Sequence, residues 1–262
     1  MSAGAQLYDL IGSGYRAHRR PDPRIAAAIA TALADAATVV NVGAGAGSYE
    51  PADRPVVAVE PSAAMIAQRR PGSAPAVQAS ATHLPFRDGS FAAALAVLTV
   101  HHWPDRARGL AELARVARER VVLLTWDPAT PGFWLVDDYV PEIWAVDRPI
   151  FPTLGELERR LGPIEVRPVA VPHDCTDGFL GAYWRRPEAY LDPGVRGAMS
   201  TFSKLRDVEP GLARLRRDLA DGTWRRRHAN LLARPTLDLG YRLVVSHGKP
   251  RPARPATRSP DR

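Results

Sequence analysis

Residues 38–48 read TVVNVGAGAGS, an uninterrupted apolar run that passes directly into a turn with glycine at every second position. Strands covered on both faces of a parallel sheet have such continuous apolar runs. Gly43, Gly45 and Gly47 let the chain turn sharply and bring its backbone against a ligand, because no Cβ blocks the approach and a positive φ costs little. The stretch therefore predicts a buried parallel strand that ends in a ligand-binding turn.

The next apolar run, Pro55–Val59, ends in an acidic residue. Glu60 follows Gly43 by 17 residues and stands at the end of this second strand. A carboxylate there can accept hydrogen bonds from both hydroxyls of a ribose. Ser62 predicts the N-cap of a helix over Ala63–Arg70. The turn and Glu60 together predict half of a nucleoside site; the alternative is a tight structural turn beside a solvated strand end.

The rest of the chain alternates strands with helices. Helices are expected over Arg24–Asp35, Ala107–Arg118 and Thr153–Leu161, from caps and from apolar residues spaced three and four apart. This rhythm predicts an α/β protein with a Rossmann-like, doubly wound, mostly parallel seven-stranded sheet and right-handed crossovers. The remaining strands are expected at Ala76–Ala79, Ala92–Val100, Val121–Leu124, Ile164–Val171 and Leu239–Ser246.

Two segments interrupt the rhythm. Residues 127–150 are rich in aromatic and acidic side chains, and residues 172–236 are too long for a loop without structure of its own. We interpret both as a helical lid over the carboxyl ends of the strands, where ligands bind in such sheets. Residues 1–248 then form one domain that begins with an N-terminal helical flap, residues 1–36. The Pro- and Arg-rich end, residues 249–262, is expected to be a disordered basic tail.

Composition excludes several classes of protein. Hydrophobic residues make up 45% and charged residues 24% of the 262 residues, as in globular proteins. Cys175 is the only cysteine, so the chain can form no internal disulfide and no thiolate zinc cluster. No run of 18 apolar residues and no signal-like N-terminus occurs. We therefore expect a cytoplasmic protein without a membrane span.

The net charge of +7 is concentrated in two places. Lys204–Arg227 and the tail from Lys249 each contribute +4, which leaves the remainder, with the predicted nucleoside site, nearly neutral. Proteins with an extended phosphate footprint usually carry positive charge beside the working site. We therefore disfavour a nucleic-acid partner and expect a small-molecule substrate, with the chain acting as a monomer or homodimer.

Three segments resemble one known family. Val39–Ser48 resembles motif I of the class I methyltransferases, and Glu60–Ile66 resembles the segment that follows their motif II. Ala79–Phe91 is similar to the adenine-side segment of the small-molecule branch often called methyltransferase type 11. A dinucleotide fingerprint fits less well, because it requires glycine where the chain has Ser48. The resemblance implies S-adenosylmethionine as the cofactor.

The sequence departs from the family pattern at two positions. Ser80 stands where the family commonly has an aspartate that contacts adenine, and Ala92 stands where an aspartate usually starts the fourth strand. The segment around Tyr8 and Tyr15 resembles the flap that closes over the methionine part of the cofactor; packing is the alternative role for these tyrosines. The resemblance assigns cofactor contacts to Gly43, Ala44, Gly45, Gly47, Glu60, Pro61, Ser80, Ala81, Leu98, Tyr8, Tyr15 and Arg16.

Methyl transfer from a sulfonium is an in-line displacement that requires a positioned nucleophile and removal of its proton. His101 and His102 follow the fourth strand, where the substrate is expected to meet the methyl group. We favour His102 as the general base over a structural role for both histidines. No metal ligands can be recognised. The density of aromatic residues around the lid predicts an apolar substrate pocket. Core packing is the alternative explanation for each of these residues taken singly. The candidates for substrate contacts are Trp103, Trp126, Trp134 and Trp184.

The sequence thus predicts methyl transfer to an oxygen, nitrogen or carbon atom of a small, partly apolar molecule. An NAD-dependent oxidoreductase is the alternative from another class. A relative that binds S-adenosylmethionine without methylating is a third interpretation, and an RNA methylase that uses its basic tail is a fourth. A comparison of S-adenosylmethionine binding with NAD binding distinguishes the first two interpretations.

Overall fold

The computed structural model describes residues 17–247. These residues build a seven-stranded sheet with the strand order β3-β2-β1-β4-β5-β9-β6. The five strands from β3 to β5 in that order pair in parallel, and β9 pairs antiparallel with both β5 and β6. The predicted Rossmann-like, mostly parallel sheet is confirmed. Its strands are β1 (Val39–Val42), β2 (Val56–Val59), β3 (Ala76–Val77), β4 (Phe91–Val97), β5 (Ala117–Trp126), β6 (Ile164–Pro168) and β9 (Tyr241–His247).

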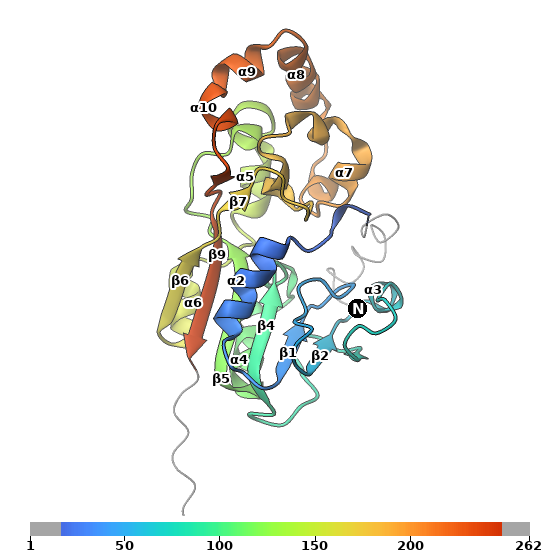
Figure 1. Ribbon diagram of the computed structural model, residues 1–262, viewed down its shortest axis with the longest axis vertical. Helices are drawn as coiled ribbons and strands as arrows, with labels where there is room; N and C mark the ends of the chain where they lie inside the picture. The colour runs from blue at the N-terminus through green and yellow to red at the C-terminus, as the bar shows by residue number, and fades with distance from the viewer. Residues whose placement is uncertain (1–16, 248–262) are drawn as a thin grey trace, which may run out of the picture.

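Both faces of the sheet are buried, which explains the continuous apolar runs. Alternate residues of a strand point to opposite faces. Val39 belongs to the core under α2 (Pro23–Leu33), and Val40 belongs to the core under α4 (Arg106–Val116). Figure 1 shows α2 lying across the front of the sheet, where it contacts β5 and β9. Two further helices are α3 (Ala63–Ala67) and α6 (Leu154–Leu161), and α6 packs on α4.

Several element boundaries differ from those predicted; α3 ends at Ala67 rather than Arg70, and the strand predicted over Ile164–Val171 leaves the seven-stranded sheet after Pro168. The strand β4 ends at Val97 rather than Val100, because Leu98 has a positive φ of 49° and the 3-10 helix η1 (Val100–His102) follows. The helix α4 ends at Val116, and β5 begins already at Ala117, whose pairing with β4 includes a register shift. The predicted N-cap is confirmed, since the Ser62 hydroxyl accepts a hydrogen bond from the Met65 N–H.

Residues 127–150 and 172–236, which we call the lid, carry helices as predicted. Figure 1 shows these helices grouped beyond the carboxyl ends of the parallel strands. The helical elements are η2 (Leu135–Tyr139), α5 (Glu142–Asp147), η3 (Leu180–Tyr183), η4 (Pro187–Leu191), α7 (Pro193–Gly197), η5 (Phe202–Lys204), α8 (Glu209–Ala220), α9 (Thr223–Arg227) and α10 (Ala229–Leu232); a two-stranded sheet of β7 (Val171–Pro172) and β8 (Thr236–Leu237) lies at its base.

The lid has an aromatic core of its own. Trp134 and Trp184 are buried, and the Trp134 indole N–H donates to the Trp184 carbonyl (N···O 2.8 Å). The Trp184 indole N–H donates in turn to the Val171 carbonyl (3.0 Å). A buried indole needs such a partner for its N–H. These residues therefore join the two lid segments to each other and to β7.

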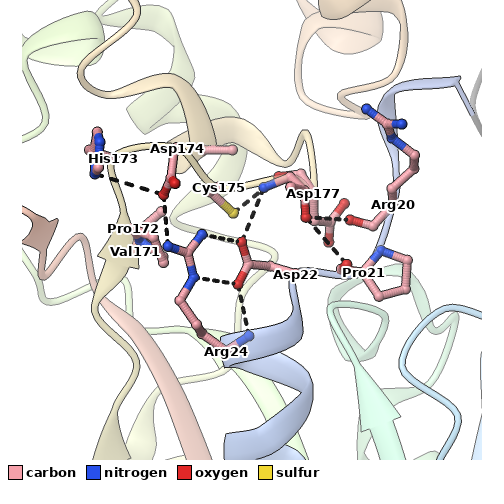
Figure 2. Close-up of polar contacts among 12 residues, drawn as sticks. Arg20, Pro21, Asp22, Arg24, Val171, Pro172, His173, Asp174, Cys175 and Asp177 are labelled. Atoms are coloured by element: carbon pink, nitrogen blue, oxygen red, sulfur yellow. Dashed lines mark hydrogen bonds and ion pairs between the residues drawn. The ribbon is translucent and has the colours of Figure 1, made fainter.

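The N-terminus of α2 is tied to the lid by polar contacts (Figure 2). Asp22, the N-cap of α2, is fully buried and accepts hydrogen bonds from the backbone N–H of Arg24 (3.0 Å) and of Thr176 in the lid (3.1 Å). Arg24 donates to Asp22 and also to the exposed Asp174. One carboxylate thus serves the helix and the loop of the lid at once.

A second carboxylate completes this connection. Asp177 is buried and forms an ion pair with Arg19. It also accepts a hydrogen bond from the hydroxyl of Tyr49 (3.0 Å), which lies just after the glycine turn. The Tyr49 hydroxyl accepts from the Asp22 N–H (3.2 Å). These residues join α2 and the end of the glycine turn to the lid. We call them the interlobe cluster: Arg19, Asp22, Tyr49, Thr176 and Asp177.

Some sequence predictions concern residues beyond this description. The predicted tail, residues 249–262, and Tyr8, Tyr15 and Arg16 of the predicted flap all lie outside residues 17–247. Within the described range, no helix combines the length and the apolarity needed to cross a bilayer.

Candidate functional site

The glycine turn has the backbone conformation expected of it. Gly43, Gly45 and Gly47 all have positive φ, at 72°, 53° and 93°. The Gly43 and Ala44 N–H groups both donate to the Val59 carbonyl at the end of β2 (2.8 and 3.1 Å). The turn is therefore anchored to the neighbouring strand at its first step.

Glu60 is fixed by backbone donors on both of its oxygens. Its Oε2 accepts from the Gly45 N–H (2.9 Å), and its Oε1 accepts from the Ser62 N–H (2.9 Å). The residue is only 6% exposed. Hydrogen bonds from backbone N–H groups hold a carboxylate in one orientation and favour its charged form. The turn and the end of β2 are thus parts of one rigid wall.

A first pocket of about 910 Å³, its open mouth included, lies over this wall. Gly47 does not line it; a Cβ there would lie 3.3 Å from the guanidinium of Arg69, so this glycine makes room for the ion pair between Arg69 and Glu50. Of the predicted cofactor residues, the following line it: Gly43, Ala44, Gly45, Glu60, Pro61, Ser80, Ala81 and Leu98.

The two departures from the family pattern each have a local explanation. The Ala92 N–H donates to the hydroxyl of Thr38 (3.0 Å), so the start of β4 is ordered without the usual aspartate. Ser80 keeps its hydroxyl at the pocket, where it lies 3.0 Å from the Thr82 hydroxyl and accepts from the Thr82 N–H. A hydroxyl therefore replaces a charged group at this wall.

A second pocket of about 820 Å³, again with its open mouth, lies between the strand ends and the lid. The indoles of Trp126 and Trp144 stack with their centroids 5.7 Å apart, and Phe151 meets Trp126 edge-on at 5.3 Å. The Trp126 indole N–H donates to the Leu239 carbonyl (2.9 Å), which fixes its ring. The lining includes six aromatic rings, namely those of Trp126, Phe133, Trp144, Phe151, Phe179 and Tyr241.

The two pockets share one boundary. Arg19, Leu98 and His102 line both of them. Leu98 has a φ of 49°, a conformation that costs a residue with a side chain about 1–2 kcal/mol. Its N–H donates to the Leu124 carbonyl (2.8 Å), which holds the strained position against β5. Backbone strain of this kind gathers at functional sites.

The two predicted catalytic histidines occupy different places. His102 lines both pockets, whereas His101 lines only the second, where its ring stacks on Phe151 with centroids 3.9 Å apart. Burial, together with the positive charges of Lys204 and Arg19, lowers the pKa of His102 to about 3. Burial, followed by the field of His102, lowers the pKa of His101 well below its usual value. Both imidazoles are therefore neutral near pH 7.

The four predicted substrate tryptophans separate into three groups. Trp126 lines the second pocket. Trp103 lines the first pocket instead, and its ring covers Gly109, where a Cβ would lie 2.4 Å from it. Trp134 and Trp184 line neither pocket and belong to the lid core. Of these four tryptophans only Trp126 therefore lies at the second pocket, and substrate contacts of Trp103, Trp134 and Trp184 stay predictions that the pocket linings do not support.

Several pocket residues carry no signal in the sequence. Arg19 precedes the first predicted helix, Tyr49 follows the turn, and Asp147 and Thr201 come from the two separate lid segments. Arg19 lies in the predicted flap, and Asp147 and Thr201 lie in the two predicted lid segments, but no motif marks any of these residues individually. They come together only because the lid folds over the sheet.

The first pocket fits the cofactor that the resemblance implies. A backbone turn without Cβ atoms, a buried carboxylate and a small polar wall at Ser80–Ala81 suit a nucleoside with free ribose hydroxyls. Arg19 at the boundary supplies a positive charge. No second glycine-rich segment accompanies the turn, so nothing beyond the half-site suggests a pyrophosphate.

Comparison with known proteins agrees with this geometry. The family model described as "Methyltransferase domain" matches residues 40–125. A putative methyltransferase from an antibiotic biosynthesis pathway of Anabaena variabilis is 32% identical, with a TM-score of 0.80, over 87% of this chain and 98% of that one.

Two other solved structures share the fold at low identity. A SAM-dependent methyltransferase of Thermotoga maritima, described as a possible histamine N-methyltransferase, is 17% identical, with a TM-score of 0.57, over 93% of this chain and 99% of that one. The [4+2]-cyclase SpnF is 13% identical, with a TM-score of 0.58, over 95% and 96%. Fold, family model and the Anabaena relative agree: the chain belongs to the class I S-adenosylmethionine-dependent methyltransferases, in the type 11 branch, and its cofactor is S-adenosylmethionine.

Proposed function

We propose that the enzyme transfers the methyl group of S-adenosylmethionine to a small, partly apolar molecule bound in the second pocket. The observation that carries the proposal is the boundary formed by Arg19, Leu98 and His102. A cofactor in the first pocket would reach an acceptor in the second only across these three residues. Aromatic walls suit an acceptor with a flat apolar part.

Each wall of the first pocket has a part in this proposal. The backbone at Gly43–Gly45 would lie against the cofactor, and Glu60 would accept the ribose hydroxyls. Pro61, Ser80 and Ala81 would border the adenine, and Leu98 would lie beside the sulfonium, which supplies the transferable methyl group. Tyr8, Tyr15 and Arg16 stay as proposed contacts to the methionine part.

The basic lid helices support a small-molecule acceptor over a nucleic acid. No residue between Phe202 and Asp238 lines either pocket, and from the basic stretch Lys204–Arg227 only the field of Lys204 acts on His102 and Asp147. The pathway given for the Anabaena variabilis relative suggests natural products for an acceptor panel. We propose a cytoplasmic enzyme that acts as a monomer or homodimer. RNA affinity that falls steeply with salt would favour the RNA methylase instead.

The first test is calorimetric titration with S-adenosylmethionine, S-adenosylhomocysteine and NAD. We expect the first two to bind. Glu60→Gln should weaken both by about 10²-fold or more, because an amide offers one acceptor oxygen and turns its NH₂ toward the N–H of Gly45 or Ser62. Glu158→Gln, on the exposed face of α6, is the matched control. Tight binding of NAD alone would support the oxidoreductase.

His102 provides the second test. A neutral imidazole at the boundary can accept the hydrogen bond of the nucleophile and orient it. Because its pKa of about 3 makes it a weak base, we expect His102→Ala to lower kcat by about 10²-fold, the low end for general bases. His102 should stay neutral from pH 5 to 8. Its titration should therefore cause no change of kcat with pH in this range. Unchanged transfer rates would remove His102 from the mechanism.

Formation of S-adenosylhomocysteine over a broad acceptor panel is the readout for transfer itself. Cofactor binding without any such product would favour the non-methylating relative.

A further inference from the structure

The second pocket contains one carboxylate among its described lining residues. Asp147 ends α5 and is 4% exposed. Its neighbours in the lining are mostly apolar, aromatic and aliphatic side chains together. A buried carboxylate in apolar surroundings is costly, so its presence here needs a physical explanation.

Only half of this carboxylate is satisfied by the protein. The Thr201 hydroxyl donates to Oδ2 (2.8 Å), whereas the buried Oδ1 has no hydrogen-bond partner among residues 17–247. Burial raises the pKa of Asp147 to about 6, against the opposing effects of the Thr201 hydrogen bond and the positive charge of Lys204. The protein keeps an acid here that it does not neutralise with an ion pair in the described chain.

The groups that face Asp147 do not supply the missing donor. Lys204 on η5 acts on it only through its field, and Tyr241 on β9 donates no bond to it. His101, across Phe151, has a buried Nδ1 that is also without a partner in the described chain. Phe151 itself donates its N–H to the Asp147 carbonyl (3.1 Å), so these groups form one wall. Two buried polar atoms without a partner in the described chain thus lie in a lining that is mostly apolar.

We propose that Asp147 determines the acceptor specificity of the enzyme, with Oδ1 accepting a hydrogen bond from an N–H or O–H group on a flat aromatic acceptor. The inference rests on the proposed function of the second pocket. Asp147 does not line the first pocket, so it contacts a part of the acceptor away from the transferred methyl group. Trp126 and Trp144 flank the aromatic part, and the carboxylate fixes its direction in the pocket.

Binding of simple probes tests the inference without knowledge of the natural acceptor. The probes are 2-naphthol, 2-(aminomethyl)naphthalene and 2-methylnaphthalene, added to the enzyme saturated with S-adenosylhomocysteine. Tryptophan fluorescence reports binding, since Trp126 and Trp144 line the pocket. We expect the wild type to bind at least one donor probe about 10-fold or more tightly than 2-methylnaphthalene, as for a hydrogen bond to a charged partner.

Two substitutions separate the sources of the donor. Asp147→Leu should abolish the preference for both donor probes. Asp147→Asn keeps an acceptor oxygen without charge, so it should retain a preference for 2-naphthol and lose one for the ammonium probe. Glu142→Leu, exposed on the same helix α5, is the matched control and should leave all three affinities unchanged.

Three measurements keep this test separate from that of the proposed function. Failure of the wild type to bind S-adenosylhomocysteine would overturn the proposed function. Normal cofactor binding with the same probe preference in Asp147→Leu would overturn the inference alone. Thermal unfolding tests whether Asp147 has a purely structural role. Removal of an incompletely paired buried acid should leave the melting temperature of Asp147→Leu equal to that of the wild type or higher. A lowered melting temperature would overturn the inference.

Discussion

Replacement of Gly43 by alanine is expected to abolish S-adenosylmethionine binding and to lower the free energy of unfolding by about 4 kcal/mol. Gly43 has a φ of 72°, and a Cβ there would lie 2.1 Å from the Thr99 hydroxyl oxygen and 2.8 Å from two Thr99 carbons. Thr99 belongs to the wall of the same pocket. The added carbon must therefore displace either the turn or that wall, and both border the cofactor. Denaturant unfolding and calorimetric titration measure the two effects.

Gly72→Ala is the matched control for this experiment. Gly72 has a φ of 82°, and its added Cβ would meet nothing within 4 Å. It should thus show only the backbone cost, about 1 kcal/mol, with unchanged cofactor binding. Thr99→Gly in the Gly43→Ala chain removes all three clashing atoms and should restore part of the stability. A Gly43→Ala enzyme that binds S-adenosylmethionine as tightly as the wild type would contradict the geometry.

The parallel half of the sheet could be predicted because both of its faces are buried. Val39–Val42 is buried at every position and is apolar except for Asn41, and the strands β2 and β4 beside it are buried at all but one position each. The boundary of α4 and β5 could not be predicted as well. Residues Arg118–Arg120 are polar and follow the helix without a break, and only their pairing with β4 makes them part of a strand.

The site could be predicted only where it is local in sequence. Glu60 and the glycine turn lie on adjacent strand ends, and both were identified from their own segments. Asp147 and Thr201 come from separate lid segments, so no spacing links them before the chain folds. Aromatic density indicated a pocket but gave no direction for a ring: Trp126 faces the pocket, whereas Trp184 faces the lid core.

Asp22→Ala is expected to destabilise the protein by about 4 kcal/mol, because one carboxylate performs two tasks. Loss of a helix N-cap costs about 1 kcal/mol. The further cost arises because the Thr176 N–H in the lid loses its acceptor at a fully buried site. The partly exposed guanidinium of Arg24 loses its ion pair as well. The interlobe cluster also positions Arg19 and Tyr49, which line the first pocket, so the KM for S-adenosylmethionine should rise as well.

Asp192→Ala isolates the cost of capping alone. Asp192 also precedes a proline at the start of a helix and accepts from a backbone N–H, that of Gly194 (2.7 Å), but it is exposed. Chemical denaturation of both variants should show the larger loss for Asp22→Ala. Equal losses would mean that the contacts between α2 and the lid contribute no stability.

The pH dependence gives an independent check on Asp22. Burial raises its pKa, but the hydrogen bonds from Arg24 and Thr176 outweigh burial and lower the pKa from 3.8 to about 2. A carboxyl group with a lowered pKa stabilises the fold above its unfolded pKa, and that contribution is lost as the pH falls through its folded pKa. The shift corresponds to about 2 kcal/mol. The stability difference between wild type and Asp22→Ala should therefore be constant above pH 5 and shrink by about that amount between pH 4 and pH 2. A difference that stays constant over this acid range would show that Asp22 is not held as a charged acceptor between helix and lid.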